Sequence, residues 1–408
     1  MLRKAAARLA RWLSERRSRK RNQEGEAAMS GDLGRKSDAW WAEFTARAQD
    51  LDSLFAQRRK WDLPGWMHEH LGAIDGHLMW EFGPAVQGKG HRLVITPESC
   101  RYLRPLVRRI LDRAPKMDGW EFHAYRPPED LDMAEQTVKA RTGGSIARTF
   151  FRATLNDINK IDLLFLSRDY ASGEDRQGFN DVFVATETLL GEEILDRWIA
   201  AVEVARLDHG PEEPQGVREL KGVVDGLIGR VRDSLPGVPY FRLPEESTWT
   251  ACELTPQESE DYPHQQDMFV GNSMIDLMWR NAHSNQSFDS VRFSRHGETF
   301  CYLKIDGSNG LEDSRFADKG EIVDAVDAAL RKAEAGCFVG RGTGLRYSYL
   351  DLALVDCDRG ADVVRQVLRE GNIPRRSWIL FFDTDLQAEW IGIWDDTPPP
   401  PMVEVPES

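Results

Sequence analysis

Two pairs of aspartates follow two apolar segments near the C-terminus, and their spacing could hold a metal ion. Asp356 and Asp358 follow one predicted strand, and Asp383 and Asp385 follow the next. If these strands run parallel around the intervening helix, both pairs lie at one sheet edge. Carboxylates are the ligands that Mg²⁺ and Ca²⁺ prefer, so one interpretation is a divalent-cation site. In the other, Asp358 caps the helix and residues 383–385 form a turn.

A glycine-rich segment is the second candidate for chemistry, and it comprises Gly340, Arg341, Gly342 and Gly344 with Arg346 close behind. Phosphate-binding loops run from a strand into a helix, whereas this segment runs into another apolar strand pattern. It also lacks the Lys-Ser/Thr pair of a nucleotide-binding loop. We therefore expect either a turn or bulge that needs positive φ, or a loop whose amides hold an anion or a peptide.

The remaining polar motifs favour no enzyme class. His68 and His70 lie on nearly opposite sides of a predicted helix, so they cannot chelate one ion together. The chain has five cysteines and no CxxC pair, which argues against a disulfide framework or a structural zinc site. This cysteine usage is typical of a reducing compartment and predicts a cytoplasmic protein. Apart from the possible Mg²⁺ or Ca²⁺, the sequence predicts no cofactor.

Charge is distributed unevenly along the chain. The net charge is −14, yet residues 1–22 hold nine Lys and Arg against one Glu. We expect the acidic folded body to repel nucleic acid and anionic membranes. The basic segment has three interpretations: an amphipathic helix that binds membrane or nucleic acid, a transit peptide, or a solvated tail preceding a true start at Met29. No apolar run is long enough to cross a bilayer.

Hydrophobic periodicity predicts an α+β fold with two domains. Each domain is expected to contain a mixed or mainly antiparallel sheet with helices packed on one face, built from ββαβ-type units and preceded by N-terminal helices. Segments 93–125 and 350–382 share the order strand, helix, proline and strand. An amphipathic helix with apolar residues at Leu220, Val224 and Leu227 is expected to bridge the domains.

Changes in composition suggest the domain boundaries. We predict a basic tail and linker over 1–36, a first domain over 37–208, a linker with the bridging helix over 209–240, a second domain over 241–397, and a proline-rich tail over 398–408. The stretch 245–261 carries six acids and no base, which predicts a solvated loop.

These observations favour a non-enzymatic binding or interaction protein with an unidentified protein partner. The reason is the combination of packed acidic domains with no cofactor fingerprint. The alternative is a metal-dependent enzyme that uses the acidic sheet edge of the C-terminal domain. An enzyme requires a concave site with perturbed titratable groups, whereas a binding module requires only an exposed apolar or charged patch.

Overall fold

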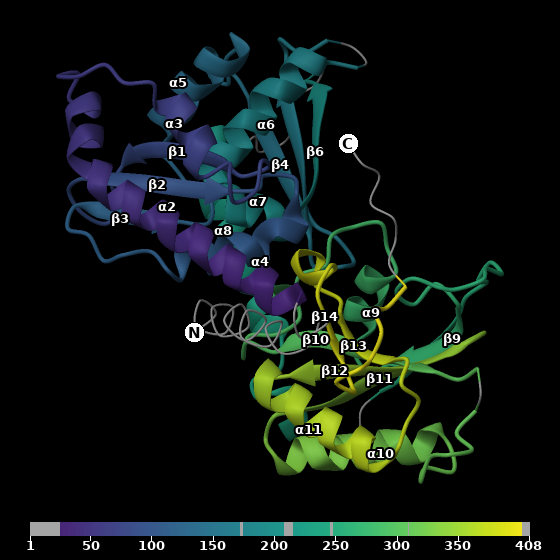
Figure 1. The fold of residues 1–408 in the computed structure, drawn as a ribbon. Helices are drawn as coiled ribbons and strands as arrows, with labels where there is room; N and C mark the ends of the chain where they lie inside the picture. Colours follow the sequence, from purple (N-terminus) through teal and green to yellow (C-terminus); the bar gives the residue numbers. More distant parts are fainter. Residues whose placement is uncertain (1–24, 172–173, 208–214, 245–247, 309, 402–408) are drawn as a thin grey trace. The chain divides into compact units, whose positions relative to one another are not determined.

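The computed structural model describes residues 25–171, 174–207, 215–244, 248–308 and 310–401. Its fold is mixed α+β, as predicted, with three sheets and accompanying helices (Figure 1). The chain divides into two compact units, residues 1–125 and 126–408. This division lies away from the predicted 209–240 linker, and the predicted domain scheme remains a prediction.

The first unit is a ββαβ arrangement preceded by two helices. Its elements are α2 (Gly25–Phe55), α3 (Leu63–His70), β1 (Met79–Pro84), β2 (His91–Thr96), the 3-10 helix η1 (Arg101–Leu103), α4 (Arg104–Leu111) and β3 (Trp120–His123). The strand order is β1-β2-β3, with β1 antiparallel and β3 parallel to β2. A helical connection is what a parallel neighbour such as β3 requires.

An aromatic core explains why α2 is helical. Trp40, Trp41, Phe44 and Leu51 recur at helical spacing and are almost fully buried. The helix already includes Gly25, the first described residue, so residues 25–36, which were predicted to be part of a tail and linker, are helical instead. No proline interrupts residues 25–55, and the packed stripe stabilises the helix more than local propensity does.

The second unit begins with another ββαβ arrangement. Its elements are α5 (Leu131–Thr142), β4 (Phe150–Leu155), β5 (Ile161–Ser167), α6 (Arg176–Leu190), α7 (Glu192–Trp198), β6 (Ile199–Arg206), β7 (Gln215–Gly216), η2 (Val217–Glu219) and α8 (Leu220–Ser234). The strand order is β6-β5-β4-β7, with β4 antiparallel and β6 parallel to β5. The predicted apolar stripe of α8 is buried, and the helix packs on β4 and α6.

A seven-stranded sheet completes the second unit. Its elements are η3 (Tyr240–Arg242), β8 (Thr250–Glu253), β9 (Met268–Ser273), α9 (Asp276–Ala282), η4 (Ser290–Arg292), β10 (Thr299–Asp306), α10 (Lys319–Lys332), β11 (Gly336–Gly344), β12 (Tyr347–Leu354), α11 (Cys357–Glu370), β13 (Ser377–Phe381), η5 (Thr384–Leu386) and β14 (Trp390–Gly392). The order is β14-β13-β10-β12-β11-β9-β8, and every neighbouring pair is antiparallel.

The two faces of this sheet differ in chemistry. One face carries buried aliphatic side chains such as Leu303, Leu350 and Ile379, and helices α10 and α11 lie side by side along it (Figure 1). The opposite face carries buried polar and aromatic side chains, here called the polar face: Tyr302, Lys304, Asp306, Tyr347, Tyr349 and Asp351. Strand alternation places these six on one side.

No helix among the described residues is long and apolar enough to span a bilayer.

Candidate functional site

The four predicted metal ligands lie at the ends of two parallel strands, as the sequence suggests. Strands β12 and β13 both run antiparallel to β10, so they run parallel to each other and both end at one sheet edge. However, β10 lies between them, which separates the strand ends by about 10 Å at the usual strand spacing. Within the described ranges, no three His, Cys, Asp or Glu side chains are placed to hold one metal ion.

Two of these carboxylates have local structural roles. Asp356 is the N-cap of α11 and accepts a hydrogen bond from the backbone N–H of Arg359 at 3.1 Å. Asp383 accepts hydrogen bonds from the backbone N–H of Ser290 at 2.7 Å and from its hydroxyl at 2.5 Å. Asp358 lies in the first turn of α11, and Asp385 lies in η5. In the described part of the chain, these four carboxylates therefore do not gather around one Mg²⁺ or Ca²⁺ position.

Burial gives Asp383 an unusual protonation equilibrium. Removal from water and the neighbouring Asp289 carboxylate raise the pKa of Asp383 to about 7, although the bonds from Ser290 oppose this. Arg197 pairs with Asp289 at 3.2 Å. Asp383 therefore titrates near neutrality, and its bonds to Ser290 hold η4 in place.

The glycine-rich segment is a strand, which corrects the expectation of a loop. Residues 336–344 form β11, which pairs with β12 on one side and β9 on the other. Gly340, Gly342 and Gly344 do not have positive φ, although the register with β12 does shift between Phe338 and Gly340. Because the ladders use the strand's amides, they are not free to form an anion cradle, and Arg341 projects to solvent.

Close approach explains the alternating glycines. A Cβ at Gly340 would lie 2.5 Å from Oδ2 of Asp351. At Gly342 it would collide with Sδ of Met268, and at Gly344 with the carboxylate of Asp267. Glycines at every second residue leave one face of β11 without side chains, so another segment can lie on it.

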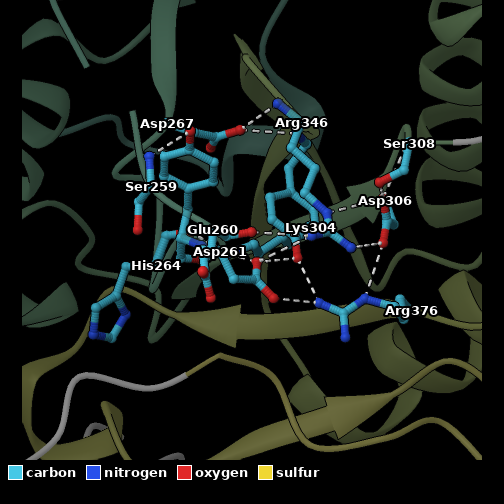
Figure 2. Close-up of polar contacts among 12 residues, drawn as sticks. Ser259, Glu260, Asp261, His264, Asp267, Lys304, Asp306, Ser308, Arg346 and Arg376 are labelled. Carbon is cyan, nitrogen blue, oxygen red and sulfur yellow. Dashed lines mark hydrogen bonds and ion pairs between the residues drawn. The ribbon is translucent and has the colours of Figure 1, made fainter. Parts of the chain in front are cut away.

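That segment is residues 255–267, which we call the strap. It connects β8 to β9 and crosses the polar face without regular secondary structure. Tyr262 and Asp267 are buried in it. Asp261, the last residue of the predicted solvated loop 245–261, bonds to Tyr347 and Arg376, so the end of that loop is docked on the sheet. Figure 2 shows its residues meeting Lys304 of β10 and the two arginines that directly precede β12 and β13, Arg346 and Arg376.

Lys304 is the central cation of this contact and is completely buried. Its ammonium donates hydrogen bonds to the backbone carbonyls of Tyr262 and His264, the latter at 2.9 Å. It also lies 4.1 Å from the ring centroid of Tyr347. Burial lowers the pKa of Lys304 to about 8, although the carboxylates of Asp267 and Asp261 oppose the shift. The strap thus supplies the oxygen atoms that replace water around this ammonium.

The strap's two aspartates bind complementary groups of the sheet. Oδ2 of Asp267 accepts the backbone N–H groups of Arg346 and Tyr347 at 2.8 and 2.9 Å, and its Oδ1 accepts the hydroxyl of Tyr349. Asp261 accepts the hydroxyl of Tyr347 and the guanidinium of Arg376, each at 2.6 Å. Burial opposes ionisation of Asp261, but these partners hold its pKa below the ordinary value.

The charges of the contact balance only when the strap is in place. On the sheet side, Asp306 pairs with Arg346 at 3.0 Å and with Arg376 at 2.9 Å. Together with Lys304, this gives three cations and one carboxylate in the bonded cluster, and the strap adds the two remaining carboxylates. Asp351 also lies on the polar face, where burial raises its pKa to about 7.

The sequence did not identify this cluster, although two signals were present. Lys304 and Asp306 interrupt an apolar strand at positions that share a face, and the glycines of β11 recur with the same period of two. Of the predicted anion-loop residues, Arg346 does lie in the cluster, where it binds Asp306 instead of a ligand.

The other candidate surface is the free edge of the seven-stranded sheet at β8. Leu254 N–H bonds to the carbonyl of Phe269, which sets the alternation of the β8–β9 ladder. Ala251 and Glu253 therefore direct their backbone N–H and C=O groups away from β9. In the described part of the chain, no other strand pairs with β8.

Exposed apolar side chains flank this edge. Trp249 is 41% exposed and stacks on Phe338 at 5.6 Å between ring centroids. Phe269 and Val270 of β9 are 40% and 37% exposed. Strand alternation places Val270 and Phe269 on opposite faces, so both faces of the edge present apolar area.

Compared with known protein families, curated proteins and solved structures, the chain matches none of them.

Proposed function

We propose that this protein is a non-enzymatic interaction module that binds an extended segment of another protein along β8. The supporting observation is the outward-facing backbone of Ala251 and Glu253 at the edge of the sheet. Unpaired strand edges bind extended peptides through main-chain hydrogen bonds, and flanking apolar side chains supply contact area. Trp249, Phe269 and Val270 would supply that area here.

The expected ligand has the chemistry of a β-strand with apolar residues at consecutive positions. Main-chain bonding requires an extended peptide, because a helix has no free backbone donors along its side. Apolar area on both faces of the edge favours a segment that is apolar on both sides rather than a strictly amphipathic one. We place this activity in a reducing compartment such as the cytoplasm, since all five cysteines are free.

The test is an Ala251→Pro substitution. Proline removes the outward N–H of residue 251 without removing a β8–β9 ladder bond, and edge strands tolerate it. We expect the variant to fold and to lose at least about tenfold in affinity for a partner, equivalent to roughly 1.4 kcal/mol. Partners captured by the wild-type protein from host lysate would be compared with those captured by Ala251→Pro, and their affinities measured with purified components.

Ala251→Ser is the matched control, since it keeps the N–H and should keep the partner. A photo-crosslinking residue at position 249 should attach to that same partner. A partner retained equally by Ala251→Pro and Ala251→Ser would show that the β8 edge is not its binding site. The basic segment 1–22, for which membrane or nucleic-acid binding is one interpretation, lies outside the described residues.

A further inference from the structure

The strap is longer than its connection requires. Strands β8 and β9 are antiparallel neighbours, which about two to five residues can join, yet residues 254–267 separate them. Compact domains rarely contain irregular connections of this length unless these have a function. His264 within it adopts a left-handed φ of 46°, which a non-glycine residue holds only when its surroundings impose it.

The contacts between strap and sheet include those of a bound acidic peptide. Lys304 meets two backbone carbonyls of the strap, and the Arg346 and Tyr347 amides meet one carboxylate. Arg376 meets a second carboxylate, that of Asp261. Inorganic anions would lack the carbonyl pair that Lys304 requires, so the complementary ligand is a peptide.

The contact is also accessible from one end. The side chains of Asp261 and Arg376 are 33% and 35% exposed, whereas Lys304 and Asp267 are fully buried. A competing peptide could therefore displace Asp261 first and then the rest of the strap. An empty site would leave three cations against Asp306 with Lys304 uncompensated, so it should open only as another acidic segment takes its place.

We propose that the polar face, with Arg346 and Arg376, is a binding site for an acidic peptide segment, and that the strap occupies it as an intramolecular ligand. This site is separate from the β8 edge and goes beyond the function proposed above. The tether gives the strap a high effective concentration, so wild-type protein should bind an external acidic peptide only weakly. Weakening the strap without altering the sheet should raise that affinity.

The probe is a fluorescein-labelled peptide that reproduces residues 255–267, and binding is measured by fluorescence anisotropy with the full chain. Asp261→Asn removes the exposed anchor of the strap and leaves every sheet residue intact. We expect it to bind the probe at least tenfold more tightly than the wild-type protein, and to show faster amide hydrogen exchange over residues 255–267. Glu258→Gln changes the same charge at an exposed strap residue and should bind like the wild-type protein.

Two further measurements test the location and the ligand class. Adding Arg376→Gln to Asp261→Asn should remove the gained affinity, and a probe with both aspartates replaced by asparagine should not bind. The proposal would be overturned if Asp261→Asn showed faster hydrogen exchange in the strap but bound the probe no more tightly than the wild-type protein. It would also be overturned if hydrogen exchange in the strap were the same in Asp261→Asn and in the wild-type protein. Equal competition by inorganic phosphate would also overturn it, because a peptide-specific site requires carbonyl contacts. The Ala251→Pro variant should bind the probe like the wild-type protein, which separates this site from the β8 edge.

Discussion

Buried ionisable residues on the polar face make the stability of this protein depend on pH. Burial raises the pKa of Asp351 to about 7, although the hydrogen bond from Gln265 at 3.2 Å and the charge of Lys319 oppose the shift. Burial has the opposite effect on Lys304, whose pKa it lowers to about 8. Each shift means that folding disfavours the charged form of the group, and the two act in different pH ranges.

The pH range of Asp351 gives a prediction. Between about pH 4 and pH 7 the folded protein holds a proton on Asp351 that the unfolded chain has released, so the free energy of unfolding should fall as pH rises. Asp351→Asn cannot titrate and should flatten this fall by about 1.4 kcal/mol for each unit of pKa shift removed. Urea unfolding at several pH values between 4.5 and 7.5 would measure it.

Asp324→Asn, at an exposed position of α10, is the control and should retain the wild-type slope. This range lies below the window from about pH 8 to 10.5 in which Lys304 contributes. In that window the free energy of unfolding should rise with pH, because Lys304 binds its proton more tightly in the unfolded chain than in the folded protein. An Asp351→Asn slope equal to that of the wild-type protein would show that Asp351 is already ionised at pH 5.

At the scale of elements, glycines serve opposite purposes in β11 and α8. Gly342 lies where a side chain would collide with Met268, so the position of β9, which directly follows the strap, depends on its missing Cβ. Gly222 lies inside α8, is exposed, and has no atom near the place its Cβ would take. A glycine inside a helix costs about 0.5–1 kcal/mol relative to alanine.

The same substitution should therefore have opposite signs at these two positions. Gly342→Ala should destabilise the protein by about 1–3 kcal/mol through overpacking, and it should accelerate hydrogen exchange in the strap. Gly222→Ala should stabilise it by about 0.5–1 kcal/mol. Chemical denaturation measures both values. If Gly342→Ala left the free energy of unfolding unchanged, Met268 would be able to move aside, and β11 would not fix the strap.

Helices with a continuous apolar stripe were predictable, and the strap was not. The stripe of α8 and the aromatic stripe of α2 are properties of short sequence windows, so local periodicity identified them. The acids at 258–261 indicated a solvated loop because their partners are distant in sequence. Arg346 and Arg376 approach Asp261 only after β12 and β13 have paired with β10.

At the scale of the whole molecule, a ββαβ arrangement occurs in each of the two units, and both examples lie within the predicted first domain, residues 37–208. It appears as β1-β2-α4-β3 and again as β4-β5 followed by α6, α7 and β6. The predicted likeness of 93–125 to 350–382 holds for element order only. Strands β2 and β3 are direct neighbours, whereas β10 lies between β12 and β13. Local sequence order cannot reveal such an insertion, because the intervening strand comes from elsewhere in the chain.

Separate cores predict separate unfolding. Phe44 is fully buried in the aromatic core of the first unit. Phe44→Ala should cost that unit about 3–5 kcal/mol. Hydrogen exchange measured by mass spectrometry should then accelerate in β1, β2 and β3, while β10 and β12 keep their wild-type protection. Equal acceleration in all five strands would mean that the two units unfold as one cooperative body.

The strand order of the large sheet also bears on how the nascent chain emerges from the ribosome. Strand β10 lies between β12 and β13, and both of these are synthesised after it. At roughly 5–20 residues per second, β10 waits several seconds for its two neighbours. During that delay, β10 has no hydrogen bonds to β12 or β13, and its apolar residues and Lys304 are not yet buried. Translation speed between residues 306 and 381, together with access to chaperones, should therefore govern the yield of native protein.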